Sequence, residues 1–277
     1  MTHSNLRVAF QGERGAYSEA AAVTFFGDSI ELLPCNDFDA VFEAVTHGQA
    51  DRGVLPVENS LAGSIHRNYD LLLRYNLSIV GEVQIPIAHQ LIALPGVSLA
   101  DIKKVYSHPQ ALAQCEQSIT RLLPRVERVA AYDTAGSVKM IKEQNITDGA
   151  GLASQRAASI YQMNILQPDM QDNEENYTRF VVVAPEPIAP TGDAKTSIVF
   201  SMDNVPGSLF KSLAVFALRD IDLTKIESRP LQGRRWQYLF YIDFVGSQYE
   251  ERCRNALNHL QEITTFFKVL GSYPRGV

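Results

Sequence analysis

The alternation of short strand-like runs with helical patterns over residues 7–183 constrains this chain more than any other feature. Within residues 37–47, for example, Phe38, Val41, Phe42 and Val45 recur at spacings of three and four, which places them on one face of a helix. Such alternation predicts an α/β fold of mixed sheets with helices on both faces. The predicted strands are residues 7–11, 30–34, 53–55, 77–84, 104–107, 129–131, 149–153 and 179–184, and the predicted helices are 37–47, 65–74, 109–122, 134–143 and 155–162.

A proline-rich break separates this region from the rest of the chain. Residues 184–193, APEPIAPTGD, hold three prolines and no periodicity, which indicates a linker. Beyond it the predicted order is a strand at 198–202, a helix at 207–221, strands at 223–231 and 235–245 joined near Gly233, a helix at 249–263 and a strand at 266–270. This βαββαβ order is that of a ferredoxin-like domain. Its predicted apolar faces are Leu209, Phe210, Leu213, Phe216 and Ala217 on the first helix, and Trp236, Tyr238, Phe240, Ile242 and Phe244 on the third strand.

Length and charge limit the class of protein. The 277 residues are enough for about two domains, and the net charge of -6 argues against a nucleic-acid or anionic-membrane partner. The longest uncharged stretch, 83–100, is interrupted by Pro86 and Pro95, which disfavours a membrane span. Residues 1–7 are polar, and Cys35, Cys115 and Cys253 lie far apart. We therefore expect a cytoplasmic protein.

Common cofactor and metal signatures are missing from the sequence. Gly12 and Gly15 give only G-x-x-G, and neither a Walker A loop nor a G-x-S-x-G motif occurs. The histidines and cysteines show no short metal-ligand spacing. We therefore expect neither a cofactor nor a metal.

Small and hydroxyl residues gather instead where predicted strands meet helices, at residues 15–18, 59–64, 107–108, 134–137 and 153–154. Helix starts expose free backbone N–H groups, and in open α/β sheets they meet at the carboxyl ends of strands. Together they would bind a small anion without a lysine. The alternative is that these residues are ordinary helix caps.

Four segments carry a resemblance to a known family. VAFQGERGAYSE (8–19), GVLPVENSLAGSIHRNYD (53–70), YSHPQALAQC (106–115) and NYTRF (176–180) closely resemble the prephenate dehydratase family, and the tail resembles its ACT domain. The resemblance covers essentially the whole chain. It implies a two-lobed catalytic domain like a periplasmic binding protein, with the chain crossing between lobes near 80–84, returning with 178–180, and the substrate between the lobes.

The resemblance also implies domain limits. The catalytic domain would span 1–185, with lobe 1 at about 1–81 plus 178–185 and lobe 2 at about 82–177. A linker at 186–194 and an ACT regulatory domain at 195–277 would follow.

By this resemblance the chain is a carbon–oxygen lyase of phenylalanine biosynthesis that converts prephenate to phenylpyruvate, CO2 and water. Thr178 matches the threonine of the family's Thr-Arg-Phe motif and is expected to donate a proton to the departing hydroxyl. Asn59 and Gln114 match two further catalytic positions, where amides orient a carboxylate or hydroxyl without adding charge. Glu58 is expected in a supporting position.

Further substrate-binding candidates are Ser60, Ser107, His108, Thr134, Ser154, Arg179 and Phe180. Arg179 follows Thr178 on a strand and should face the opposite way, where it would either bind a carboxylate or brace the lobes. His108 would serve either as an alternative acid or as a structural turn residue.

Two segments of the tail, VPGSLF (205–210) and IESRP (226–230), resemble the phenylalanine-binding motifs of the ACT domain. The implied allosteric site comprises Pro206, Gly207, Ser208, Leu209, Glu227, Ser228, Arg229 and Pro230. Ser208 stands where alanine is usual, and Phe210 where a smaller residue is common. The resemblance implies L-phenylalanine as effector, and a homodimer or homotetramer formed through these domains.

Two other functions remain open at this point. Residues 59–73 and 81–84 look especially like family members that accept arogenate, in which an amine replaces the side-chain keto group. The second open function is that of a binding module that senses a metabolite without catalysis, although the intact set of Thr178, Asn59 and Gln114 argues against it.

Overall fold

The computed structural model describes residues 6–231 and 237–276, which divide into two compact units. Unit 1 comprises Met1–Tyr75 and Val83–Val181, and unit 2 comprises Asn76–Glu82 and Val182–Val277. Residues 1–5 of the polar start lie outside the described residues, as do Gly233, Arg235 and Trp236 of the expected turn and strand. Two strands, β5 and β11, continue from one unit into the other.

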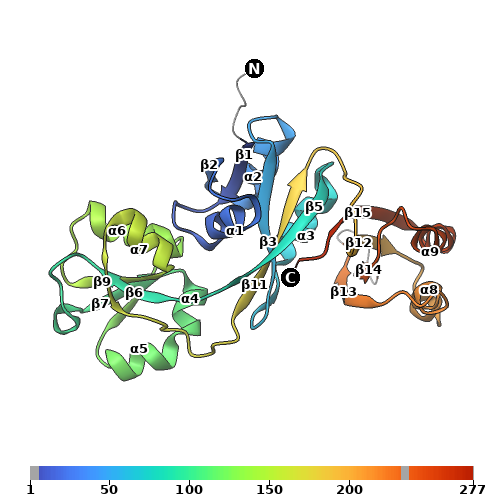
Figure 1. Ribbon diagram of the computed structural model, residues 1–277. Coiled ribbons are helices and arrows are strands. Elements are labelled where there is room, and N and C mark those ends of the chain that lie inside the picture. The colour runs from blue at the N-terminus through green and yellow to red at the C-terminus, as the bar shows by residue number, and fades with distance from the viewer. Residues whose placement is uncertain (1–5, 232–236, 277) are drawn as a thin grey trace, which may run out of the picture. The chain divides into compact units, whose positions relative to one another are not determined.

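The first sheet has the strand order β2-β1-β3-β11-β5, with β4 paired to β3. Its strands are β1 (Leu6–Gln11), β2 (Ile30–Cys35), β3 (Arg52–Asn59), β4 (Gly63–Ser64), β5 (Ser78–Pro86) and β11 (Tyr177–Ala184), and its helices are α1 (Tyr17–Phe26), α2 (Phe38–Thr46) and α3 (His66–Arg74). Strand β1 pairs in parallel with both β2 and β3, so these three strands end at the same edge. The first lobe is built on this sheet (Figure 1).

The second sheet has the order β10-β6-β9-β7-β8. Its strands are β6 (Gln90–Ala93), β7 (Lys104–Ser107), β8 (Glu127–Ala130), β9 (Gly149–Ala153) and β10 (Asn164–Gln167), and its helices are α4 (Pro109–Gln114), α5 (Glu116–Leu122), α6 (Thr134–Glu143) and α7 (Gln155–Tyr161), with a short 3-10 turn at Leu99–Asp101. Apolar residues on both faces, such as Ile92 and Leu91, pack against separate helix layers. This sheet forms the second lobe (Figure 1).

Two antiparallel connections join the lobes. The chain leaves the first sheet after Pro86, enters the second at Gln90, and returns between Gln167 and Tyr177. The backbone N–H of Ile87 donates to the Asn176 carbonyl at 2.7 Å, so the two connections are paired. The crossing comes later than the expected residues 80–84, because these still belong to β5. The two-lobed α/β fold itself is confirmed.

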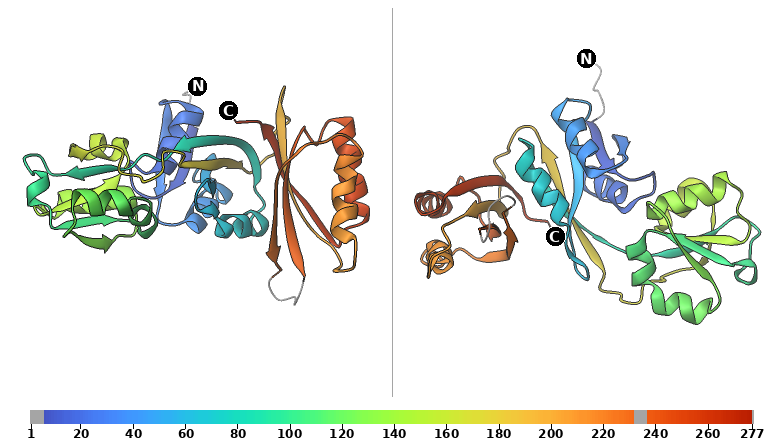
Figure 2. Two further views of the ribbon diagram at one scale, coloured as in Figure 1. Left: turned by 90° about the horizontal axis from the view of Figure 1, so that it is seen from below. Right: turned by 180° about the vertical axis from the view of Figure 1, so that it is seen from behind.

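Unit 2 contains a four-stranded antiparallel sheet of order β13-β14-β12-β15. Its elements are β12 (Ala194–Ser201), α8 (Ser208–Ala217), β13 (Leu223–Pro230), β14 (Tyr238–Val245), α9 (Glu251–Glu262) and β15 (Phe266–Pro274), which is the expected βαββαβ order. Both helices cover one face of the sheet (Figure 2), where Phe200, Phe216 and Phe244 are fully buried. Leu209 and Phe210 were expected on the apolar face of this helix, but they do not join the core, because α8 begins at Ser208 and its first turn is exposed.

The structure differs from the predicted elements at one helix and two strands. The helix expected over 109–122 is two helices, since Cys115 adopts a non-helical ψ of 15° with φ -116° between them. Strands β6 and β10, of four residues each, were not predicted from the sequence.

Candidate active site

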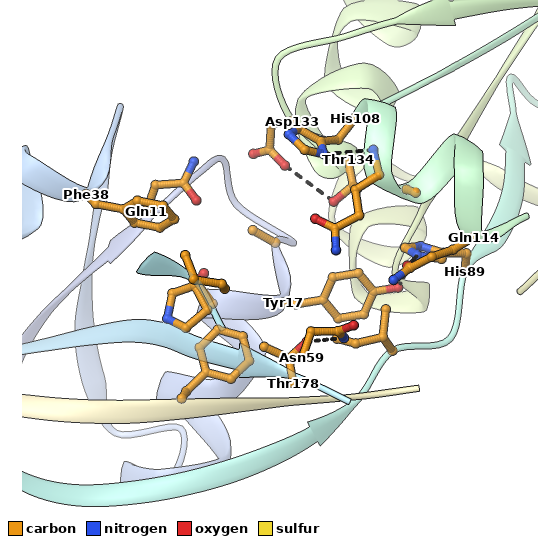
Figure 3. A pocket seen from close by; sticks show the side chains of 18 of the residues that line it. Gln11, Tyr17, Phe38, Asn59, His89, His108, Gln114, Asp133, Thr134 and Thr178 are labelled. Atoms are coloured by element: carbon orange, nitrogen blue, oxygen red, sulfur yellow. Dashed lines mark hydrogen bonds between the residues drawn. The ribbon is translucent and has the colours of Figure 1, made fainter. Parts of the chain in front are cut away.

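Unit 1 contains a cavity of about 290 Å³, close to the lower limit of small-molecule pockets. Both lobes contribute to its wall. Figure 3 shows Asn59 and Thr178 on one side, His108, Asp133 and Thr134 on the opposite side, and Tyr17, His89 and Gln114 between them. The three residues that the resemblance marked as catalytic, Thr178, Asn59 and Gln114, thus line one cavity.

Asn59 ends strand β3, next to β11 in the sheet, and its amide is fully used by the protein. Its Nδ2 donates to Asn176 Oδ1 at 2.7 Å, to the Tyr177 carbonyl at 3.1 Å and to Thr178 Oγ1 at 3.0 Å. Its Oδ1 accepts the backbone N–H groups of Leu61 and Ala62 at 3.1 and 2.9 Å. The side chain is 6% exposed. Asn59 therefore has no N–H left for a ligand, and its contact is with Thr178.

This arrangement directs the hydroxyl of Thr178. Its Oγ1 accepts from Asn59, and in the described part of the chain its own O–H has no protein acceptor. The proton is therefore available to a ligand in the cavity. Alternation along β11 places Phe180 on the same wall and Arg179 on the opposite face, where its guanidinium lies 3.9 Å from Glu58.

A buried chain of hydrogen-bonding groups supports Gln114 at the end of α4. Tyr17 Oη lies 3.1 Å from His89 Nδ1, and His89 Nε2 lies 3.2 Å from Gln114 Oε1. Burial lowers the pKa of His89 to about 4, opposed by its hydrogen bond to Gln114, and raises the pKa of Tyr17 well above its usual value. Both side chains are therefore neutral at neutral pH.

Helix starts from both lobes reach the cavity. Tyr17 begins α1, Phe38 begins α2, and His108 and Asp133 cap α4 and α6. His108 Nδ1 accepts from the Gln110 N–H at 3.2 Å, so its ring has a structural contact at the turn that begins α4. Helix starts present partial positive charge and free N–H groups, so this wall favours an anion.

Asp133 also links the two lobes. Its carboxylate accepts the backbone N–H of Glu13 at 2.8 Å and that of Ala135 at 3.1 Å, while burial raises its pKa above the usual value. The glycines of the G-x-x-G segment allow this approach. Gly12 has φ +107°, and a Cβ there would lie 2.7 Å from Asp133 Oδ2; Gly15 has φ +89°, and a Cβ would lie 2.6 Å from the Ala157 Cα. The G-x-x-G segment thus lets the loop after β1 pack closely on the second lobe.

An ion pair strengthens the same contact between lobes. Glu19 on α1 is fully buried and accepts from Arg156 on α7 at 2.8 and 2.9 Å, from Arg14 at 3.1 Å, and from the Gly15 N–H at 2.6 Å. Ser154 Oγ adds a bond of 2.6 Å to the Gly15 carbonyl. These bonds hold the lobes together beside the cavity.

Several predicted substrate donors lie away from the cavity. Ser60 Oγ bridges the Glu175 carbonyl and the Tyr177 N–H, Ser107 Oγ donates to the Leu152 carbonyl, and Ser154 caps α7. Their hydroxyls are short enough to satisfy nearby backbone groups and are used there. Arg179 is excluded from the wall by strand alternation, whereas His108, Thr134 and Phe180 do line it.

Other cavity residues were not singled out from the sequence, namely Gln11, Tyr17, Phe38, His89, Tyr132 and Asp133. Tyr17 and Gln11 both lie within the VAFQGERGAYSE segment (8–19), so that motif could have identified them as cavity residues. His89 has no local signal, because it lies in the crossing segment, which the sequence predicted at the wrong place.

Unit 2 has a second cavity of about 420 Å³, lined by residues 202–205, 207–210, Tyr238 and Phe240. Gly207, Ser208 and Leu209 of the expected allosteric set lie on it, whereas Pro206 does not; Glu227, Ser228, Arg229 and Pro230 lie on β13 and also do not line it. Across residues 6–231 and 237–276, no group of three or more His, Cys, Asp or Glu residues is arranged to hold a metal. None of the helices described is both long enough and apolar enough to span a membrane.

Comparison with known proteins identifies the family. The prephenate dehydratase family profile matches residues 8–188. Arogenate dehydratase/prephenate dehydratase 2, chloroplastic, of Arabidopsis thaliana is 54% identical over 282 residues, covering 98% of this chain and 73% of that protein.

Two solved structures share the whole fold. Prephenate dehydratase of Arthrobacter aurescens, in complex with L-Phe, has a TM-score of 0.89 at 34% identity, covering 98% of this chain and 90% of that one. GqqA, described as a novel type of quorum quenching acylase, has a TM-score of 0.88 at 33% identity and covers 97% of both chains.

The relatives correct the expected cytoplasmic location. The A. thaliana protein above and two further A. thaliana relatives are named chloroplastic, a plastid location. Polar residues at 1–7 and separated cysteines were too weak a basis for assigning a compartment. The matched profile, the identity to curated dehydratases and the shared fold together establish that this chain is a dehydratase, a carbon–oxygen lyase, and belongs to the prephenate dehydratase family.

Proposed function

We propose that the cavity of unit 1 removes CO2 and water from prephenate, and that it accepts arogenate as a second substrate. The C–C bond to the ring carboxylate breaks and its electron pair forms a ring double bond. The ring C–O bond breaks at the same time, and the departing hydroxide takes one proton to become water. The prephenate dianion and one proton thus give the phenylpyruvate anion, CO2 and water.

The single observation that carries this proposal is the hydrogen-bond direction at Thr178. Asn59 donates to Oγ1, which leaves the threonine proton for the departing hydroxyl. A threonine is a weak acid, so its help is a hydrogen-bonded transfer in a site shielded from water. Thr178 is only 8% exposed and lies between the two lobes of unit 1, which fits such shielding.

The remaining cavity groups suit the recognition of an anion by neutral donors. Gln114, His108 and the starts of α1, α2 and α6 supply them. Preorganised donors of this kind stabilise a transition state without reorganisation. No lysine or arginine occurs among the described residues that line the cavity.

One observation favours arogenate as a second substrate. Asp133 supplies the sole carboxylate among the described lining residues, and an ammonium group would pair with it. The A. thaliana relative is named for both activities, which supports the same reading.

The test is turnover of purified protein with prephenate and with arogenate, followed as phenylpyruvate and phenylalanine. Thr178→Ser should keep most activity, while Thr178→Val should lose at least about 100-fold in kcat, the lower range for a general acid. Near-normal turnover by Thr178→Val would remove the hydroxyl from the mechanism. A parallel assay for acylase activity tests the activity named for GqqA; acylase activity without turnover of either acid would replace the proposal.

We further propose that residues 195–277 form an ACT regulatory domain, with a catalytic domain at 1–185 and a linker at 186–194. The βαββαβ order, the cavity beside Gly207 and the L-Phe complex of the A. aurescens enzyme support this. L-Phenylalanine would bind in the cavity, and Glu227–Pro230 of a second copy would close it, which requires a homodimer or homotetramer. A titration of activity against L-phenylalanine with no inhibition or activation would count against the regulatory role.

A further inference from the structure

The segment that crosses between the lobes places one buried histidine between two cavity residues. His89 is 2% exposed, and its ring meets that of Tyr17 edge to face, with centroids 5.5 Å apart. Its backbone is held by the returning connection, because its N–H donates to Gln171 Oε1 at 2.9 Å and its carbonyl accepts the Met170 N–H at 2.7 Å. The backbone at His89 is therefore fixed, and its ring lies beside Tyr17 and Gln114 (Figure 3).

The partners of the ring define where its proton lies. Gln114 Oε1 can only accept a hydrogen bond, so His89 Nε2, 3.2 Å away, carries the proton and donates it to this oxygen. In a neutral ring Nδ1 is then a bare acceptor. The single proton of the Tyr17 hydroxyl, which donates to the Ala88 carbonyl at 2.8 Å, is shared with Nδ1 at 3.1 Å in a three-centre hydrogen bond. The Ala88 carbonyl accepts a second hydrogen bond, from Gln90 Nε2 at 3.2 Å.

The opposite arrangement would reverse the polarity of the cavity wall. If Nδ1 carried the proton, Nε2 would accept from the Gln114 amide nitrogen, and Oε1 would face a ligand instead. In the observed orientation Gln114 Nε2 has no protein partner within the described residues, and it is the end of the amide left for a ligand. A donor suits a carboxylate, keto or hydroxyl oxygen, whereas an acceptor would repel it.

We propose that His89 is a positioning residue that fixes the Gln114 amide so that its N–H group faces the substrate, with the Tyr17 hydroxyl holding the imidazole in the required tautomer. This inference rests on the proposed dehydratase function. It assigns His89 and Tyr17 to one unit with Gln114, joined across both lobes of unit 1. Neither residue need touch the reacting atoms.

A double-mutant cycle separates this role from ordinary packing. His89→Leu removes both ring nitrogens, and Gln114→Met removes the amide at similar volume. Each should lower kcat/KM about 10- to 100-fold, the range for one hydrogen bond to a charged group. The two changes together should be no worse than Gln114→Met alone, because His89 acts only through that amide. His89→Gln, which restores an N–H donor near the position of Nε2, should recover most of the activity.

Gln90→Met provides the matched control. Gln90 is 5% exposed and donates to the Ala88 carbonyl beside the same ring, but it does not line the cavity. Its effect on kcat/KM, whatever its size, should multiply with that of Gln114→Met. Effects of His89→Leu and Gln114→Met that also multiply, or a His89→Gln variant as inactive as His89→Leu, would overturn the inference.

Two further results keep the test decisive. If His89→Leu fails to fold, Tyr17→Phe replaces it in the cycle. Tyr17→Phe should lower kcat/KM in the wild-type protein but have no further effect on kcat/KM in the Gln114→Met variant. Wild-type protein that turns over neither prephenate nor arogenate would defeat the proposed function itself. If the wild type is active but the effects of His89→Leu and Gln114→Met on kcat/KM multiply, the positioning role of His89 fails while the proposed function stands.

Discussion

Asn59→Asp is the sharpest perturbation of this site, because it changes one donor group into an acceptor at constant shape. The Oδ1 atom remains to accept the backbone N–H groups of Leu61 and Ala62. The new oxygen replaces a nitrogen that serves three acceptors, at 2.7, 3.1 and 3.0 Å. Asn176 can answer by turning its amide, whose Nδ2 is buried without a partner among the described residues. The Thr178 hydroxyl can keep a hydrogen bond to residue 59 only by rotating its proton toward the new carboxylate.

That rotation withdraws the proton from the cavity, so kcat should fall by about 100- to 10,000-fold, the contribution of one general acid. KM should change far less, since Asn59 has no N–H left for the substrate. Stability should also fall, by about 2 to 4 kcal/mol, because the Tyr177 carbonyl loses its side-chain donor and a carboxylate is buried. Initial rates and urea unfolding measure the two effects separately.

Asn68→Asp is the matched control for this change. Asn68 is fully buried, its Nδ2 donates to the Pro56 carbonyl at 2.7 Å, and it does not line the cavity. It should lose similar stability while kcat per folded molecule stays near the wild-type value. Asn59→Asp with kcat within tenfold of wild type, or equal kcat losses in both variants, would refute the assignment of the Thr178 proton.

Three further predictions concern buried charge and protonation. Lys195→Met should destabilise unit 2 by about 3 to 5 kcal/mol in urea unfolding, because the buried carboxylate of Glu82 loses the cation that lies 2.7 Å from it; adding Glu82→Gln should recover much of the loss. The pKa of His89 is about 4 in the folded protein and 6.5 in the unfolded chain, so between these pH values the unfolded chain binds more protons. About 3 kcal/mol of stability that is present above pH 6.5 should therefore be lost as the pH falls to 4. This loss should be missing in His89→Gln, as pH-dependent unfolding would show. Arg156→Met removes the arginine that pairs with Glu19 from the other lobe, so KM should rise several-fold while the stability of unit 2 stays unchanged. An unchanged KM would show that this ion pair does not help to hold the lobes together around the substrate.

The sequence predicted the alternation of strands and helices well, because helices such as α2 show an apolar face in the spacing of their side chains, and uncharged runs such as 149–153 indicate buried strands. It also placed the site where strands end and helices begin, and the starts of α1, α2, α4 and α6 do reach the cavity. Asn59 ends a strand, whereas Thr178 lies at the start of β11 and Gln114 at the end of α4. Local patterns did not show which hydroxyl groups would be free. Ser107 and Ser154 satisfy backbone groups whose positions depend on the tertiary fold.

The contacts of His89 illustrate the same limit more strongly. Its two ring partners lie 72 and 25 residues away in sequence, on different lobes. No spacing rule links residues at such separations, and the crossing segment that unites them was expected several residues too early. A site of this kind is predictable in its location but not in its proton arrangement.

The absence of lysine and arginine from the described cavity wall has a consequence for how the substrate arrives. A protein of net charge -6 does not attract a dianion from a distance, so diffusional encounter gains nothing from electrostatic steering. Added salt should screen the repulsion and speed capture. Selection among metabolites then takes place after contact, when an incoming acid exchanges its hydration shell for amide and hydroxyl donors, so anions of equal charge but different shape are told apart by fit alone.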